Sequence, residues 1–188
     1  MQPRQGMDSE RGFTLVELLV YSLLLVLVLS IVGGMLASTT TTSKTVGSIT
    51  QATTAGQLVA NSVTRGIRNS SDFQLTPVGT DQLLVARTAQ GGATLTWTCA
   101  AWYYSAAGVG TIYYTTSTAI LAPPTATDLA SWTLLDTGIS PLSGTDIFTE
   151  DGTQISLAFN ATAGSNPPVA ITSSAVSRAG ATGVPACY

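Results

Sequence analysis

Glu17 is the only charged residue in an apolar segment that runs from Phe13 to Leu36. A carboxylate in such a segment is costly unless it has a partner. Cleavage of the chain after Gly12 would supply one, because the new α-amine of Phe13 would lie one helical turn from Glu17. The alternative places Glu17 close enough to the membrane interface to reach the lipid head groups. Gly12, Phe13 and Glu17 are therefore candidate site residues.

The apolar segment is long enough to cross a membrane. As a helix it would extend for about 36 Å, and the hydrocarbon core of a bilayer is about 30 Å thick. Arg4 and Arg11 precede the segment, and the next basic residue is Lys44. This bias predicts a cytoplasmic N-terminus. We therefore expect a single-pass protein of the cytoplasmic (inner) membrane whose C-terminal part lies outside.

The residues around Glu17 also form a recognisable pattern, RGFTLVELLV at residues 11–20. It combines a basic residue, a glycine, an aromatic residue, a hydroxyl residue and a lone glutamate at fixed spacing. The pattern resembles the class III signal of type IV pilins and type II secretion pseudopilins. This resemblance implies that a prepilin peptidase cuts after Gly12 and N-methylates Phe13. It also implies that Glu17 neutralises the N-terminal amine of a neighbouring subunit during filament assembly.

The resemblance further implies partners and a location. The expected partners are other pilin or pseudopilin subunits, the prepilin peptidase, an inner-membrane assembly platform and membrane lipid, with no direct nucleic-acid partner. After assembly, the head is expected in an extracellular or periplasmic filament. The apolar segment has two alternative interpretations besides a prepilin-type signal. One is a secretory signal peptide cut near residues 36–38, and the other is an uncleaved signal anchor. The apolar run is longer than the core of about 7 to 15 residues found in signal peptides, and it contains a charge.

The two cysteines, Cys99 and Cys187, are far apart in the chain. They lack the spacing of a metal site or a dithiol redox motif. A single disulfide that joins the chain end to a strand is typical of an exported protein. The alternative is two free buried thiols.

The composition excludes many kinds of enzyme. The chain has no histidine, so Ser-His-Asp and Cys-His catalysis and HExxH zinc sites are impossible. It has 7 basic and 10 acidic residues and a net charge of −3, which argues against a broad basic face for nucleic acid. Its 30 Thr and 19 Ser residues favour a sheet with a polar, uncharged surface. We expect no enzymatic activity and no cofactor.

Two periodicities predict an α+β fold, with a long N-terminal helix packed on an antiparallel β-sheet head. Apolar or small residues recur at steps of three or four from Val46 to Ile67, which predicts one docking face of a helix. From Leu83 onward the period is two, and the short Gly- and Pro-containing turns predict an antiparallel meander. The predicted strands lie at residues 83–87, 94–99, 102–105, 111–117, 132–136, 154–160 and 169–176. The predicted turns lie at residues 91–92, 108–110, 123–124, 151–152 and 167–168.

These elements predict four parts of the chain. Residues 1–12 form a leader peptide, and residues 13–37 form the membrane-spanning half of the helix, which becomes the filament-core helix. Residues 38–72 form the amphipathic half that docks on the head, and residues 73–188 form the Thr-rich antiparallel β head. The run from Ser38 to Ser43 and the preceding Gly pair are poor helix formers. We therefore expect a bend or a locally melted stretch between the two halves.

Some side chains suggest ligands. Six aromatic residues lie in the predicted strands: Trp97, Trp102, Tyr103, Tyr104, Tyr113 and Tyr114. They could form a stacking platform for sugar or single-stranded nucleic acid, but alternating aromatics are more often core residues. Arg65 and Arg68 could form a small anion site, although cations near a helix C-terminus are favoured anyway. Asp146, Glu150 and Asp151 could bind calcium, but they lack the spacing of an EF-hand and fit a hairpin turn.

A second, looser resemblance concerns the subclass. The helix end at residues 65–73, the strand at 83–85 and the aromatic strands at 102–104 and 112–114 resemble minor pilins of the W type and pseudopilins of the J type. This implies a less abundant structural subunit that primes assembly or lies near the tip of a type IV pilus-like or type II secretion-like filament. The alternatives are the major pilin and a membrane-anchored exported binding domain that does not polymerise.

Overall fold

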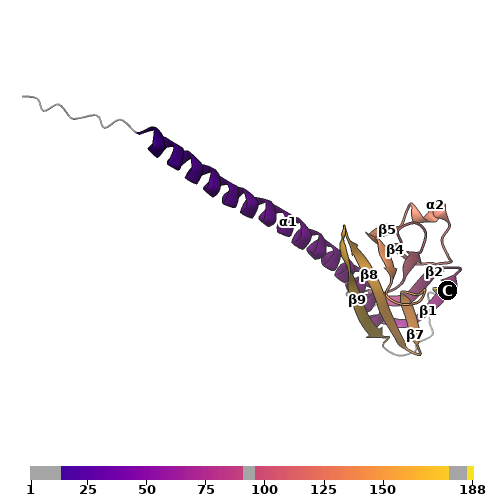
Figure 1. Cartoon of the computed structure of the whole chain (residues 1–188). Helices are drawn as coiled ribbons and strands as arrows, with labels where there is room; N and C mark the ends of the chain where they lie inside the picture. The colour runs from indigo at the N-terminus through magenta and orange to yellow at the C-terminus, as the bar shows by residue number, and fades with distance from the viewer. Residues whose placement is uncertain (1–13, 91–95, 178–185) are drawn as a thin grey trace, which may run out of the picture. The chain divides into compact units, whose positions relative to one another are not determined.

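A computed structural model describes residues 14–90, 96–177 and 186–188 (Figure 1). The chain forms two compact units, Met1–Thr45 and Val46–Tyr188. The long helix α1, Leu15–Arg68, contributes residues to both units.

The first unit contains the apolar part of α1. Its large apolar side chains from Leu15 to Leu36 are exposed. A window of 18 residues has a mean hydropathy of 2.8, and none of it is buried within the structure. By length and composition, this part of the chain can cross a membrane, as the sequence predicts.

Of the bend or melted stretch expected here, the melted stretch does not form, because α1 is helical throughout residues 33–45. The hydroxyl groups of four consecutive threonines donate to main-chain carbonyl groups three or four residues earlier, at 2.8 to 3.1 Å. Ser and Thr are poor helix formers partly because their side chains compete for main-chain groups outside a helix. Here those hydroxyl groups bond within the helix, and helical residues on both sides propagate it through the stretch.

The second unit contains a five-stranded sheet with the order β1-β2-β3-β4-β5. All its neighbouring strands are antiparallel, so it is the meander that the sequence predicts. The strands are β1 (Ser70–Val78), β2 (Asp81–Gln90), β3 (Thr96–Ser105), β4 (Thr111–Ser117) and β5 (Thr133–Thr137). A short helix, α2 (Ala126–Leu129), lies between β4 and β5 in the chain.

A second, four-stranded sheet is built around β8 (Gln154–Ala163). Strand β9 (Asn166–Val176) pairs along the length of β8. Two short strands, β6 (Ile139–Pro141) and β7 (Phe148–Asp151), pair with successive parts of β8. Side chains of β8 alternate between buried and partly exposed positions, which confirms the period of two.

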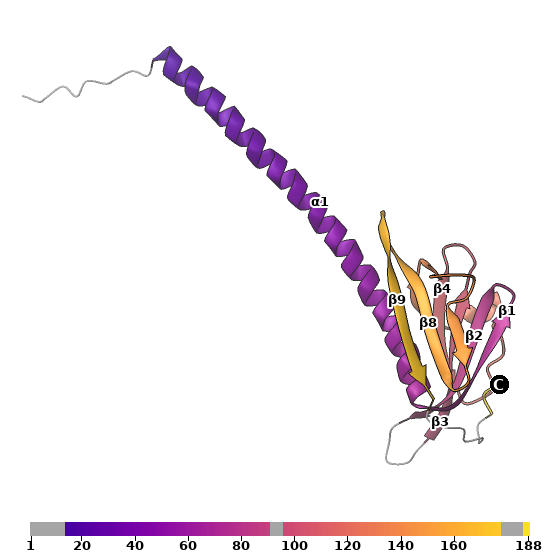
Figure 2. The ribbon, with the colours of Figure 1, turned by 60° about the horizontal axis from the view of Figure 1, so that its bottom comes forward.

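The part of α1 that belongs to the second unit packs against both sheets. Val59, Val63 and Ile67 are buried in the same apolar core as side chains of β2, β3, β8 and β9. Figures 1 and 2 show β9 beside the C-terminal part of α1. A Cβ atom at Gly56 would lie 2.8 Å from Cγ1 of Ile171 in β9. A side chain at this position would therefore require the Ile171 side chain or the helix to shift.

Some boundaries differ from the sequence-based expectation. The helix was expected to extend to residue 72, but it ends at Arg68, and β1 begins at Ser70. Pairing with β2 along residues 70–78 places this segment in the sheet. Residues 94–99 and 102–105 were expected as two strands, but residues 96–105 form the single strand β3. Continuous pairing with β2 joins them. The predicted turn at residues 91–92 lies outside the described residues.

The predicted turn at Pro167 and Pro168 is wrong, because both prolines lie in β9. The chain reverses instead at Gly164, whose φ is 62°. Proline cannot donate a main-chain hydrogen bond, so it is tolerated at the start of an edge strand or beside an irregular pairing. Strand β9 pairs only with β8 among the described strands, and its register shifts opposite Ala161 and Ala163.

Candidate functional site

Thr14 and Glu17 form the beginning of α1. The main-chain N–H of Glu17 donates to Oγ1 of Thr14 at 3.3 Å, and the N–H of Leu18 donates to the Thr14 carbonyl oxygen at 3.2 Å. Thr14 is therefore the N-cap, and Glu17 has the spacing of a capping box. A carboxylate in the first turn also interacts favourably with the helix dipole. The position of Glu17 thus has a local reason that is independent of any partner.

Tyr21 lies one turn further along α1. Its hydroxyl group donates a hydrogen bond to Oε1 of Glu17 at 3.1 Å. The sequence analysis missed this residue, although its spacing of four from Glu17 is the signal that two helical side chains can meet. Gly12 and Phe13, the other predicted residues of this site, lie outside the described residues.

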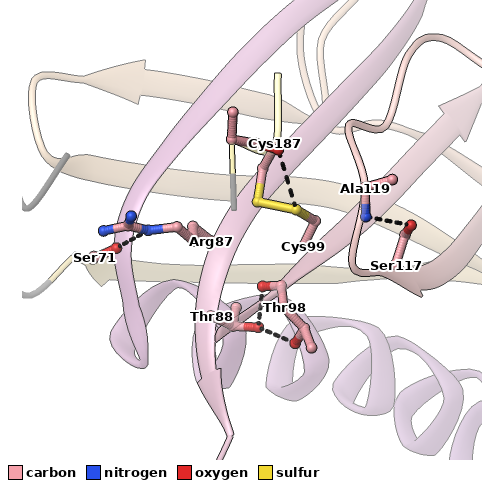
Figure 3. The surroundings of a disulfide bond; sticks show 9 residues. Ser71, Arg87, Thr88, Thr98, Cys99, Ser117, Ala119 and Cys187 are labelled. Carbon is pink, nitrogen blue, oxygen red and sulfur yellow. Dashed lines mark hydrogen bonds between the residues drawn. A yellow bond between two sulfur atoms is a disulfide. The ribbon is translucent and has the colours of Figure 1, made fainter. Parts of the chain in front are cut away.

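Cys99 and Cys187 form a disulfide, with their Cα atoms 5.3 Å apart (Figure 3). It joins β3 to the described C-terminal residues, as the sequence predicts. The main-chain N–H of Leu121 also donates to the carbonyl oxygen of Cys187 at 3.0 Å. The disulfide belongs to a second apolar cluster that includes Leu83, Val85, Ala101 and Tyr103. Strands β2 and β3 are therefore covered on both faces.

Arg87 lies beside this disulfide and is buried (Figure 3). Its Nε donates to Oγ of Ser71 at 2.7 Å, and its guanidinium carbon lies 4.9 Å from the centre of the Trp97 ring. Nearby, burial and a hydrogen bond to Asp72 raise the pKa of the Tyr188 hydroxyl group. These polar contacts and the disulfide hold β1, β2 and the C-terminal residues together.

Three of the aromatic residues of β3, Trp102, Tyr103 and Tyr104, are core residues, as expected, whereas Trp97 is partly exposed. Trp102 and Tyr104 are buried on the face that packs against α1, and Tyr103 is buried on the opposite face. The indole N–H of Trp102 donates to Oγ of Ser62 at 2.9 Å. The Tyr103 hydroxyl donates to Oδ2 of Asp81 at 2.6 Å, and burial together with this carboxylate raises the pKa of Tyr103. The six aromatic residues therefore do not form one common platform.

Gln82 is a buried polar residue that the sequence analysis missed. It lies in β2, and its side-chain amide hydrogen-bonds to the main chain of β7. The available signal was an amide directly before the apolar run at residues 83–86.

The charged residues considered as an anion site or a calcium site have different surroundings in the structure. Arg65 lines a groove between α1 and the meander sheet, whereas Arg68 does not. Among the described residues, no group of three His, Cys, Asp or Glu side chains could hold a metal ion. The calcium interpretation of Asp146, Glu150 and Asp151 therefore gains no support from the described geometry.

The comparison with protein families gives one match. Residues 7–33 match the prokaryotic N-terminal methylation motif, which is the prepilin-type signal of type IV pilins and pseudopilins. The matched range contains Gly12, Phe13, Glu17 and much of the apolar part of α1. The comparisons found no matching curated protein and no matching solved structure.

Proposed function

We propose that this chain is a structural subunit, a minor pilin or pseudopilin, of a type IV pilus-like or type II secretion-like filament. A prepilin peptidase cuts after Gly12 and methylates the α-amine of Phe13. Glu17 then pairs with the amine of a neighbouring subunit as the filament assembles. We assign the chain no reaction of its own.

The observation that carries this proposal is the position of Glu17 within the matched motif. Glu17 lies in the first turn of α1, and exposed apolar side chains follow it through Leu36. Such a surface is stable only when lipid or other apolar helices cover it. An α-amine at Phe13 would supply the charge partner that a carboxylate requires in those surroundings.

The proposal assigns a place to each part of the chain. Residues 1–12 are the leader, and residues 13–37 anchor the subunit in the inner membrane and later enter the filament core. The remaining residues form the docking helix and a head that lies outside the cytoplasmic membrane. After assembly, the head is part of an extracellular or periplasmic filament. The partners are other subunits, the peptidase, an inner-membrane assembly platform and lipid.

The decisive experiment is mass spectrometry of the chain produced with a prepilin peptidase. We expect a mature N-terminus at Phe13 that carries one methyl group. Gly12→Val should leave uncut precursor in the membrane, whereas Gly6→Val, a matched change within the leader, should be processed normally. A terminus near Ser38 would support a secretory signal peptide, and an intact leader would support a membrane-anchored domain that does not polymerise. Either result would overturn the proposal.

A further inference from the structure

A groove of about 550 Å³ lies between α1 and the meander sheet, entirely within the second unit. Asn61 and Arg65 of α1 form one side, and Gln90 of β2 and Thr116 of β4 contribute polar groups from the sheet. Tyr114 provides its accessible aromatic surface, and the buried Trp102 ring lies behind it. This size and mixture of apolar surface with a few polar groups are typical of a small-molecule site.

The polar groups of the groove fall into two sets. Ser62 and Thr88 are engaged within the protein, because Ser62 accepts a hydrogen bond from Trp102 and Thr88 donates to Thr98. The second set makes no side-chain hydrogen bond or ion pair with another described residue, and it consists of Asn61, Arg65, Asn69, Gln90 and Thr116. These residues are exposed, so three amides, a hydroxyl group and a guanidinium group line the groove and can exchange water for a ligand.

The Tyr114 ring of the groove is supported by the buried Trp102 ring. The Trp102 ring lies against Gly66, where a Cβ atom would overlap it, and its indole N–H is bonded to Ser62. The centre of the Tyr114 ring lies 5.4 Å from that of Trp102, with 41° between the ring planes. Tyr114 is partly exposed, so its ring offers an apolar surface to a ligand.

A sugar ring matches this combination of groups. Its C–H groups can pack on an aromatic ring while its hydroxyl groups donate to and accept from amides and hydroxyl groups. Arg65 adds a planar double donor that suits a carboxylate. We propose that the groove binds a saccharide unit that carries one carboxylate, such as a hexuronate. This inference does not depend on cleavage or filament assembly.

The charge distribution favours this ligand over nucleic acid. Binding of a nucleic acid strand relies on several cations that follow its phosphates. Arg65 is the only cation that lines the groove among the described residues. The whole chain also carries a net charge of −3. One carboxylate is therefore a better match to the groove than a polyanion.

Binding can be measured by NMR or calorimetry on the full chain in detergent micelles. We expect D-glucuronate to bind at least about tenfold more tightly than D-glucose, since only the acid pairs with Arg65. Arg65→Gln should weaken glucuronate binding by about tenfold or more and leave glucose binding within about twofold. Arg68→Gln is the matched control, because it removes an arginine three residues away that does not line the groove. It should leave both affinities unchanged.

Three results would overturn the proposal. The first is no glucuronate binding by the folded chain at about 20 mM, a concentration at which weak sugar sites are detectable. The second is an equal loss of binding in Arg65→Gln and Arg68→Gln, which would indicate a general charge effect. The third is tighter binding of oligothymidylate than of glucuronate, which would assign the groove to nucleic acid. Circular dichroism of each variant checks that the head remains folded.

Discussion

Gln82 of β2 and Phe148 of β7 are joined by two reciprocal hydrogen bonds. Nε2 of Gln82 donates to the carbonyl oxygen of Phe148 at 3.0 Å, and the main-chain N–H of Phe148 donates to Oε1 of Gln82 at 3.0 Å. The N–H of Ile147 donates to the same Oε1 at 2.9 Å. One buried side chain thus satisfies two main-chain groups of β7 and one of the residue before it, and it connects the second sheet to the meander.

The first prediction concerns this connection. Gln82→Ala should lower the free energy of unfolding by about 2 to 4 kcal/mol, because it leaves buried main-chain donors and an acceptor without partners. Gln154→Ala is the matched control, since Gln154 is partly exposed and its amide makes one side-chain hydrogen bond, to Ser156. The control should cost less than about 1 kcal/mol in urea unfolding followed by fluorescence. Equal losses in the two variants would contradict the role given to Gln82.

The second prediction concerns the contact between α1 and the meander. Gly66→Ala should destabilise the second unit by about 1 to 3 kcal/mol, because the new methyl group overlaps the buried Trp102 ring. Gly47→Ala is the control on the same helix, since a Cβ atom there meets nothing within 4 Å. That change should be neutral or stabilising by up to about 1 kcal/mol, because alanine favours a helix. A loss in both variants would point to the helix itself and not to the Trp102 contact.

The third prediction concerns the disulfide. A variant with both Cys99→Ala and Cys187→Ala should lose about 2 to 5 kcal/mol of stability. Most of this loss reflects the freedom that the unfolded chain regains, and part reflects lost packing in the second apolar cluster. The measurement is the thermal midpoint of the variant beside that of the oxidised protein. The oxidised protein should also resist alkylation in denaturant until a reductant is added, and immediate alkylation of both thiols would contradict the assignment.

The sequence predicted best what depends on neighbouring residues. The hydropathy of residues 13–36 and the spacing from Gly12 to Glu17 can be read without knowing the rest of the fold. The alternation of Ile155, Leu157 and Phe159 also records directly which face of a strand is buried. The helix, the meander and the methylation motif therefore follow from local patterns of residues.

What the sequence did not predict depends on residues that are distant in the chain. Pro167 and Pro168 are residues typical of turns. They are tolerated in β9 because this strand lies at the edge of its sheet. The hydrogen bonds of Gln82 could not be predicted from neighbouring residues, because its partner in β7 is 66 positions away. The polar groove combines groups from α1, β2 and β4, so no pattern of neighbouring residues predicts it.

The fourth prediction separates the two roles that the structure and the proposed function give to Glu17. Glu17→Gln keeps the spacing of the capping box, because glutamine can replace glutamate at this position, but it removes the charge. Glu17→Ala removes both the capping side chain and the charge. If Glu17 pairs with the α-amine of a neighbouring Phe13, both variants should fail to enter filaments, since loss of one member of a buried pair costs about 3 to 5 kcal/mol. Both should still insert into the membrane, because the segment becomes more apolar.

The measurement for Glu17 is the amount of each variant in sheared filaments relative to the membrane fraction of the same cells. Tyr21→Phe is the control, because it removes the hydrogen bond to Oε1 of Glu17 and keeps the carboxylate. This control should enter filaments normally, since the charge that meets the amine is still present. Normal incorporation of Glu17→Gln together with failure of Glu17→Ala would assign Glu17 to the beginning of the helix and not to a charge pair between subunits. Normal incorporation of both would leave Glu17 as a residue near the membrane interface, and the assembly role proposed for it would be wrong.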